Sequence, residues 1–201
     1  MRKVREALEA FCKEFLRQPY LCYTEHGLHA HFYCLLWRRL SKDERYVRLN
    51  QKKVAIIQKE YPTAKPLDKS RRQHWDISII KSPVPSVPQR TFLYDYLPLE
   101  CAIEFGLNCT EEHLRDDIDR LSHPDSNVEN GIIVHLYRLS EGISGRDLSP
   151  ATGQLLSPNR IFELIRDTRL EAYYALFDGS GKHESSAWRV DKTGTHDLLR
   201  S

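Results

Sequence analysis

Two apolar segments of this chain each contain one carboxylate at a place where a buried strand is expected. Asp76 stands in the expected strand Trp75–Ile80 (WDISII), and Glu104 stands in the expected strand Leu99–Leu107 (LECAIEFGL). A carboxylate is costly to bury unless it binds a cation or another partner. Two of them on neighbouring strands would offer the oxygen ligands that Mg²⁺ or Mn²⁺ prefers, and these ions serve phosphate chemistry. We therefore predict a divalent-metal site at Asp76 and Glu104.

A purely structural interpretation of each carboxylate stays open. An aspartate at the beginning of a strand can cap a nearby loop, as Asp76 would. A buried glutamate can pair with a basic side chain, and Arg115 is a candidate partner for Glu104. In that case both residues would belong to a small structural subunit held by ion pairs.

The remaining periodicity predicts a single α/β domain in which helices and strands alternate. Apolar residues at helical spacing indicate a helix over residues 3–17, and Thr24 is a suitable N-cap for a second helix that extends to about Leu40. The further expected elements are a strand over Val54–Tyr61, which could instead begin as a helix from Lys42, a helix from Thr110 to Leu121, a strand over Gly131–Tyr137 and a helix over residues 158–168. The stretch from there to Phe177 could continue this helix or turn into a strand. The proline-rich segment 82–89 is expected to be an excursion between strands, and residues 91–97 an extended piece. We expect the core to cover about residues 24–140 and a C-terminal helix and tail to cover about 157–201, with the tail loosely ordered from Asp178 on.

Composition narrows the class of protein. The 201 residues are 40% hydrophobic and 29% charged, as in ordinary globular domains. No apolar run approaches the roughly 18 residues of a membrane span, and the charged N-terminus does not look like a secretory signal, so we expect a cytoplasmic protein. Five cysteines without a CxxC pair predict free thiols, and no glycine-rich nucleotide-binding loop or GxSxG motif is present.

Charge is unevenly distributed along the chain. Residues 1–90 contain 19 Lys/Arg against 9 Asp/Glu, whereas the remainder contains 11 against 19. A basic half can attract a polyanion such as nucleic acid, although the two halves can also intermix on one folded surface. The basic run 69–72 (KSRR) could contact phosphates or be a charged turn.

The segments HWDISII and AIEFGLN, followed by HLRDDIDRL and GIIVHLY, resemble the PD-(D/E)XK or restriction-endonuclease-like nuclease superfamily. The resemblance covers about Thr24 to Tyr137. It implies a mixed β-sheet core flanked by helices, with elements in the order helix, three strands, helix, strand. Members of the superfamily often carry a glutamate on the helix before the sheet, which Glu25 in YTEHGLHAHF matches, and KEYPT with Glu60 resembles the first core strand of some members.

One motif position departs from the superfamily. Its second acidic motif normally reads Glu-x-Lys, and the lysine orients or activates the attacking water. Here the position two residues after Glu104 is Gly106. Asn108 is next on the same strand face and could bind a water, and the candidate replacements for the missing cation are Lys59, Lys81 and Arg115.

The resemblance implies metal-assisted hydrolysis of phosphodiester bonds in nucleic acid. DNA is the expected substrate in preference to RNA. Asp76 and Glu104 would hold Mg²⁺ or Mn²⁺, and Glu25 would contribute directly or through water. Without the lysine, a catalytically silent protein that binds nucleic acid or a partner protein is the alternative. A homodimer is compatible with the superfamily, but no residue pattern indicates one.

Two other clusters are assigned ordinary roles. On a helix, His26 and His29 would share a face while His31 points elsewhere, and their spacing does not specify zinc, so we expect surface or interface histidines. The run of Asp116, Asp117 and Asp119 is expected around a solvated helix face.

Overall fold

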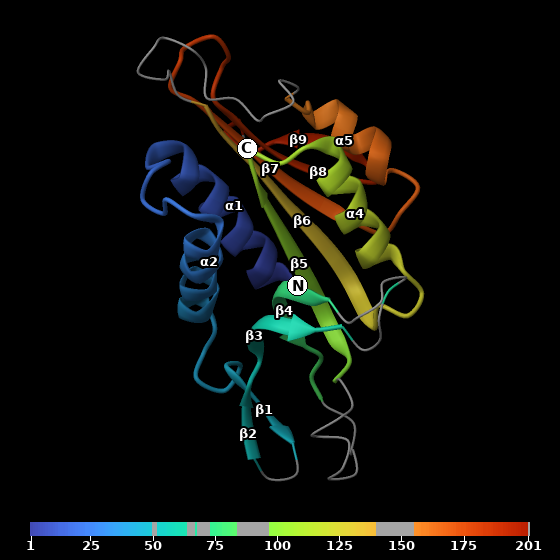
Figure 1. The fold of residues 1–201 in the computed structure, drawn as a ribbon. Coiled ribbons are helices and arrows are strands. Elements are labelled where there is room, and N and C mark those ends of the chain that lie inside the picture. Colours follow the sequence, from blue (N-terminus) through green and yellow to red (C-terminus); the bar gives the residue numbers. More distant parts are fainter. Residues whose placement is uncertain (50–51, 64–66, 68–72, 84–96, 140–154, 201) are drawn as a thin grey trace.

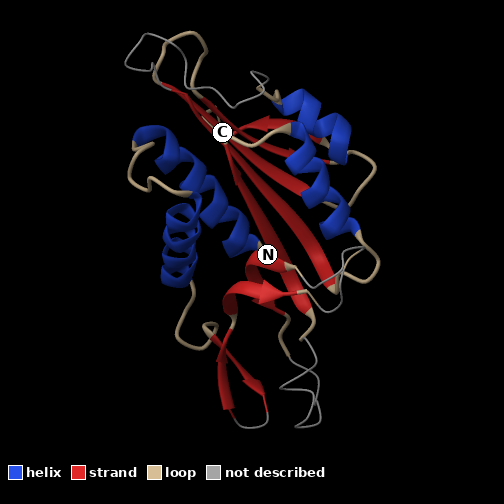
Figure 2. Cartoon of the chain, viewed as in Figure 1, coloured by secondary structure: helices blue, strands red, loops and turns tan. Residues whose placement is uncertain are grey.

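The computed structural model describes residues 1–49, 52–63, 67, 73–83, 97–139 and 155–200. Its centre is a seven-stranded mixed sheet with helices on both faces, as Figures 1 and 2 show. One face packs against α1 and α2 and the other against α4 and α5, so each face has its own apolar core. The predicted α/β class with a mixed, helix-flanked sheet is therefore confirmed. The helices are α1 (Arg2–Arg17), α2 (Glu25–Arg39), α4 (Glu111–Ser122) and α5 (Pro158–Ile165).

The sheet has antiparallel edges and a parallel centre. In the order β3-β4-β5-β6-β7-β8-β9, the pairs β5–β6 and β6–β7 are parallel and all others are antiparallel. The helix α4 connects β5 to β6, as a parallel pair requires a crossover. The strands are β3 (Ile57–Pro62), β4 (His74–Ile80), β5 (Leu99–Leu107), β6 (Val128–Leu139), β7 (Glu171–Asp178), β8 (Ser186–Asp191) and β9 (Gly194–Asp197).

Local signals explain where the helices begin. The side chains of Thr24, Thr110 and Ser157 each accept a hydrogen bond from the backbone N–H three residues on, so each caps the helix that follows it. Pro158 occupies the first turn of α5, where its missing N–H costs nothing. These boundaries agree with the prediction to within three residues, and α5 ends at Ile165 because the following residues turn into β7.

The predicted strand Val54–Tyr61 is wrong in detail. Two strands occupy the region: β2 (Lys52–Ala55) pairs with an unpredicted β1 (Tyr46–Leu49) in a separate hairpin, and β3 then enters the main sheet. The hairpin projects from the end of the sheet nearest β3 and β4 (Figure 1). Pro62 ends β3 without interrupting it, because β3 is an edge strand and can spare a donor.

The expected loose tail is also wrong. Strands β8 and β9 extend the sheet beyond β7. Ala187 and Val190 of β8 and Leu198, just after β9, are buried. Short strands rich in polar residues on their outer side gave little apolar signal in the sequence. The expected excursion over 82–89 lies mostly, and the extended piece over 91–97 almost entirely, outside the described residues, as does the basic run 69–72. Within the described part of the chain, no helix combines the length and the apolar character that crossing a membrane requires.

Candidate functional site

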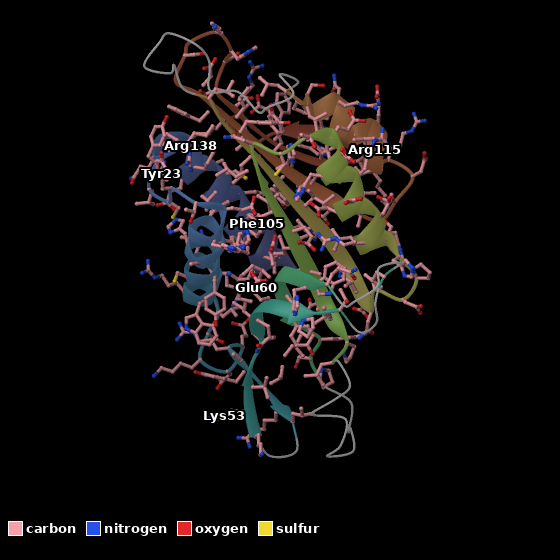
Figure 3. The ribbon with its side chains drawn as sticks, in the orientation of Figure 1. Tyr23, Lys53, Glu60, Phe105, Arg115 and Arg138 are labelled. Carbon is pink, nitrogen blue, oxygen red and sulfur yellow. The ribbon has the colours of Figure 1, made fainter. Side chains whose placement is uncertain are left out.

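Asp76 and Glu104 lie side by side at one end of the β4–β5 pair. The antiparallel register pairs Ile77 with Ile103, and continuing it by one residue puts Asp76 opposite Glu104. The Asp76 carboxylate is held by the backbone of β5, where the N–H of Phe105 donates to Oδ2 at 2.8 Å. Phe105 lies at the middle of the molecule in Figure 3. The two carboxylates predicted to share a site are therefore neighbours.

Glu104 is the more buried of the two, with 2% of its surface exposed. Arg120 on α4 brings Nη2 to 3.1 Å from Oε1, but no described residue gives that oxygen a properly directed hydrogen bond. Burial raises the pKa of Glu104 well above its usual range, Arg120 opposes the rise, and the nearby carboxyl groups of Asp76 and Asp117 add to it. The positive charge of Arg120 therefore offsets only part of the cost of burying an ionised Glu104.

Asp117 on α4 adds a third carboxylate that the sequence analysis assigned to solvent. It is 2% exposed, and Oδ1 is 2.5 Å from Nη2 of Arg120. His113 Nε2 lies 3.4 Å from its other oxygen. Asp116 and Asp119 are exposed as expected, so the prediction fails only for Asp117.

The helix α2 closes the other side of the site through Glu25 and His29. Oε2 of Glu25 accepts a hydrogen bond of 2.9 Å from the N–H of Leu107, at the end of β5. The ring of His29 is fully buried, and Nε2 lies 3.6 Å from Oδ2 of Asp76. Burial lowers the pKa of His29, against the opposing influence of Asp76 and Glu25, so the ring favours its neutral form. Glu25 borders the site as predicted, whereas the buried His29 was expected at the surface or an interface.

The position of the missing lysine is packed tightly. A Cβ atom at Gly106 would lie 3.3 Å from Sγ of Cys109 and 3.4 Å from Nδ1 of His135. Asn108, expected to bind a water, instead accepts a hydrogen bond of 2.8 Å from the N–H of Arg138. Its φ of 55° is a left-handed conformation that asparagine tolerates better than most residues. Neither residue supplies the function of the lysine.

The positive charge beside Asp76 and Glu104 comes from Arg120, which was not among the residues expected to replace the lysine. Lys81 pairs with Glu129, and Arg115 pairs with Glu111 on the outer side of α4 (Figure 3). Lys59 pairs with Glu60 at 3.1 Å and influences the site only through the charge it exerts on His29. Arg120, by contrast, contacts Glu104 and Asp117 directly.

The donor set fits a hard divalent cation. Asp76 and Glu104 offer carboxylate oxygens, the ligands that Mg²⁺ and Mn²⁺ prefer, and the Glu104 oxygen without a hydrogen bond is the atom that a cation would satisfy. Comparisons with family models, with curated proteins and with solved structures found no match to this chain.

Proposed function

We propose that the chain is a Mg²⁺-dependent nuclease of the restriction-endonuclease-like type, which hydrolyses phosphodiester bonds in nucleic acid, with DNA as the expected substrate. The observation that carries the proposal is the adjacency of Asp76 and the buried Glu104, whose oxygen lacks a hydrogen bond. The element order α2, β3, β4, β5, α4, β6 supports it, because this is the order that the sequence resemblance implies.

In this proposal Asp76 and Glu104 hold the cation, and Asp117 shares the guanidinium of Arg120 with Glu104. Such an ion, when bound, would lower the pKa of a water molecule and would stabilise charge on the phosphate. The N–H of Phe105 donates to Oδ2 of Asp76 and so fixes the orientation of this carboxylate beside Glu104. Arg120 bridges Glu104 and Asp117 and supplies positive charge next to the site, which makes it the described residue that most resembles the absent lysine in role.

A cleavage assay tests the proposal. Supercoiled plasmid and labelled duplex are incubated with Mg²⁺ or Mn²⁺ and the wild-type chain, with Asp76→Asn, with Glu104→Gln and with the control Asp116→Asn. We expect metal-dependent cleavage that falls about 100-fold or more in the two site variants, since each removes charge-stabilising chemistry from the transition state. Asp116 is exposed one residue from Asp117, so its variant should cleave like the wild type. Cleavage that survives both site variants would contradict the proposal.

The catalytically silent alternative is favoured by Gly106, where a side chain would press on Cys109, and by the ion pair between Arg120 and Glu104. It predicts that the wild type binds duplex without cutting it, and that Asp76→Asn binds equally well. Introducing the motif lysine with Gly106→Lys, together with Cys109→Gly to remove the Cβ and Sγ atoms that would each lie 3.3 Å from the new Cβ, would then produce metal-dependent cleavage.

A further inference from the structure

A second group of metal-ligating side chains lies beside the carboxylate site, between α2 and β3. His26 and His29 come from the first two turns of α2, and Glu60 comes from β3. One ligand atom from each residue lies within 4.8 Å of the others. Figure 3 shows Glu60 at the edge of the sheet just below Phe105, whose N–H holds Asp76.

The backbone brings these three residues together. Positions three apart on a helix share a face, and the rings of His26 and His29 have centroids 5.5 Å apart. The register of β3 with β4 passes from Lys59↔Ile77 to Tyr61↔Trp75, which leaves Glu60 out of the pairing with a left-handed φ of 53°. That conformation is unfavourable for a glutamate and is of the kind often retained at functional sites. It brings Oε1 of Glu60 to 4.0 Å from Nδ1 of His26.

His29 provides an independent reason to expect a ligand. Its ring is completely buried, yet neither nitrogen forms a hydrogen bond with any described residue. Buried polar groups are normally hydrogen-bonded, and one that is not calls for an explanation such as a missing ion. An imidazole nitrogen without a proton carries a lone pair that can coordinate a metal ion.

We propose that His26, His29 and Glu60 bind one divalent transition-metal ion of the Zn²⁺ type, separately from the Mg²⁺ proposed at Asp76 and Glu104. Two imidazoles and one carboxylate match catalytic zinc sites, which keep a fourth position for water. Mg²⁺ is disfavoured here because it prefers oxygen ligands.

Only small movements are needed to close the site. Ligand atoms in a tetrahedral zinc site lie about 3.4 Å apart, given bonds of roughly 2.1 Å. The side chains of His26 and Glu60 are 76% and 48% exposed, so they can rotate toward the buried His29. Zn²⁺ would replace Lys59 as the cation that Glu60 contacts. Since Nε2 of His29 also faces Asp76 at 3.6 Å, the filled site would border the carboxylate site.

Calorimetric titration of the full chain with Zn²⁺, in reducing buffer with excess Mg²⁺, tests the inference. We expect one equivalent to bind to the wild type, and Co²⁺ to give visible bands of a nitrogen–oxygen site without a thiolate charge-transfer band. His26→Ala and Glu60→Gln change exposed side chains and should fold normally, while each weakens Zn²⁺ binding at least about tenfold, because the loss of an outer-shell partner alone typically costs 10–100-fold.

Three control variants locate the ion. His31→Ala removes the histidine that pairs with Glu14 instead, Cys34→Ser removes an exposed thiol of α2, and Glu104→Gln disables the carboxylate site. All three should keep wild-type Zn²⁺ affinity. The proposal is overturned if the wild type binds no Zn²⁺, if His26→Ala binds like the wild type, or if Glu104→Gln abolishes binding. Loss of nuclease activity alone leaves these results unaffected, so the two proposals fail separately.

Discussion

At the scale of single residues, Glu104 has a clear consequence for stability. Its pKa is raised in the folded chain, so protonated Glu104 stabilises the fold at low pH, and this contribution is lost as the pH rises through the folded pKa. Glu104→Gln removes the titration. Between pH 5 and pH 8 the variant should therefore gain stability relative to the wild type, because it has no buried carboxyl group to ionise.

Urea unfolding of both proteins across this pH range measures the effect, with the exposed Glu112→Gln as the control. Adding Mg²⁺ at pH 8 should restore the stability of the wild type and leave Glu104→Gln unchanged, because only the ionised carboxylate binds the cation. Parallel pH profiles for the wild type and Glu104→Gln would mean that Arg120 already compensates the charge.

Arg120 and Arg115 both lie on α4, so substitutions at these two positions can be compared directly. Arg120 is 20% exposed and touches two buried carboxylates, whereas Arg115 is 52% exposed and pairs with Glu111. Arg120→Met should lower the free energy of unfolding by about 3 kcal/mol at pH 7, because it leaves buried carboxylates without a counter-charge. Arg115→Met should stay within about 0.5 kcal/mol of the wild type. The difference should shrink toward pH 5 as the carboxylates take up protons, and equal stabilities at pH 7 would contradict the role given to Arg120.

At the scale of elements, Thr24 fixes the helix that presents Glu25, His26 and His29. Its Oγ1 accepts a hydrogen bond of 3.1 Å from the N–H of Gly27. Thr24→Ala should cost about 1 kcal/mol of unfolding free energy, the usual value of an N-cap, while Thr24→Ser should cost little because it keeps the hydroxyl. Chemical denaturation distinguishes the two variants. A loss as large in Thr24→Ser would assign the effect to the methyl group instead of the cap.

Strong local signals explain which elements the sequence predicts. Helix caps and the apolar runs of β4, β5 and β6 are local, and these elements were placed within a few residues. The strands β1, β8 and β9 were missed because four to six polar-rich residues acquire strand structure only by pairing with a neighbour. Tertiary context, not propensity, decides such short segments.

The same distinction between local signals and tertiary context explains which residues of the candidate site could be predicted. Asp76 and Glu104 stand out because each interrupts an apolar run. Asp117 carried a readable signal that was overlooked: Leu114, Ile118 and Leu121 form the buried stripe of α4, and position 117 falls within it. The pairing of Arg120 with Glu104 could not be predicted, since it depends on how α4 crosses β5.

At the scale of the whole molecule, part of the excess positive charge of residues 1–90 lies on the β1–β2 hairpin. The register places Arg48 directly opposite Lys53, and both side chains are exposed. Like charges directly opposite in a hairpin destabilise it. A polyanion would relieve this repulsion, so we expect the hairpin to contribute to binding of the proposed nucleic-acid substrate.

The double variant Arg48→Gln/Lys53→Gln tests this role of the hairpin. Duplex binding, followed by fluorescence anisotropy in EDTA over a range of KCl concentrations, should weaken, and the slope of log K against log salt should fall by about 2, one for each lost phosphate contact. Arg166→Gln is the control, because Arg166 is exposed and lies beyond α5, in the acidic half of the chain. The hairpin itself should become more stable by about 0.2–1 kcal/mol once the repulsion is removed. A variant with an unchanged salt slope would show that the hairpin does not contact the phosphate backbone, and would direct the search for the nucleic-acid surface to other basic residues of the first ninety.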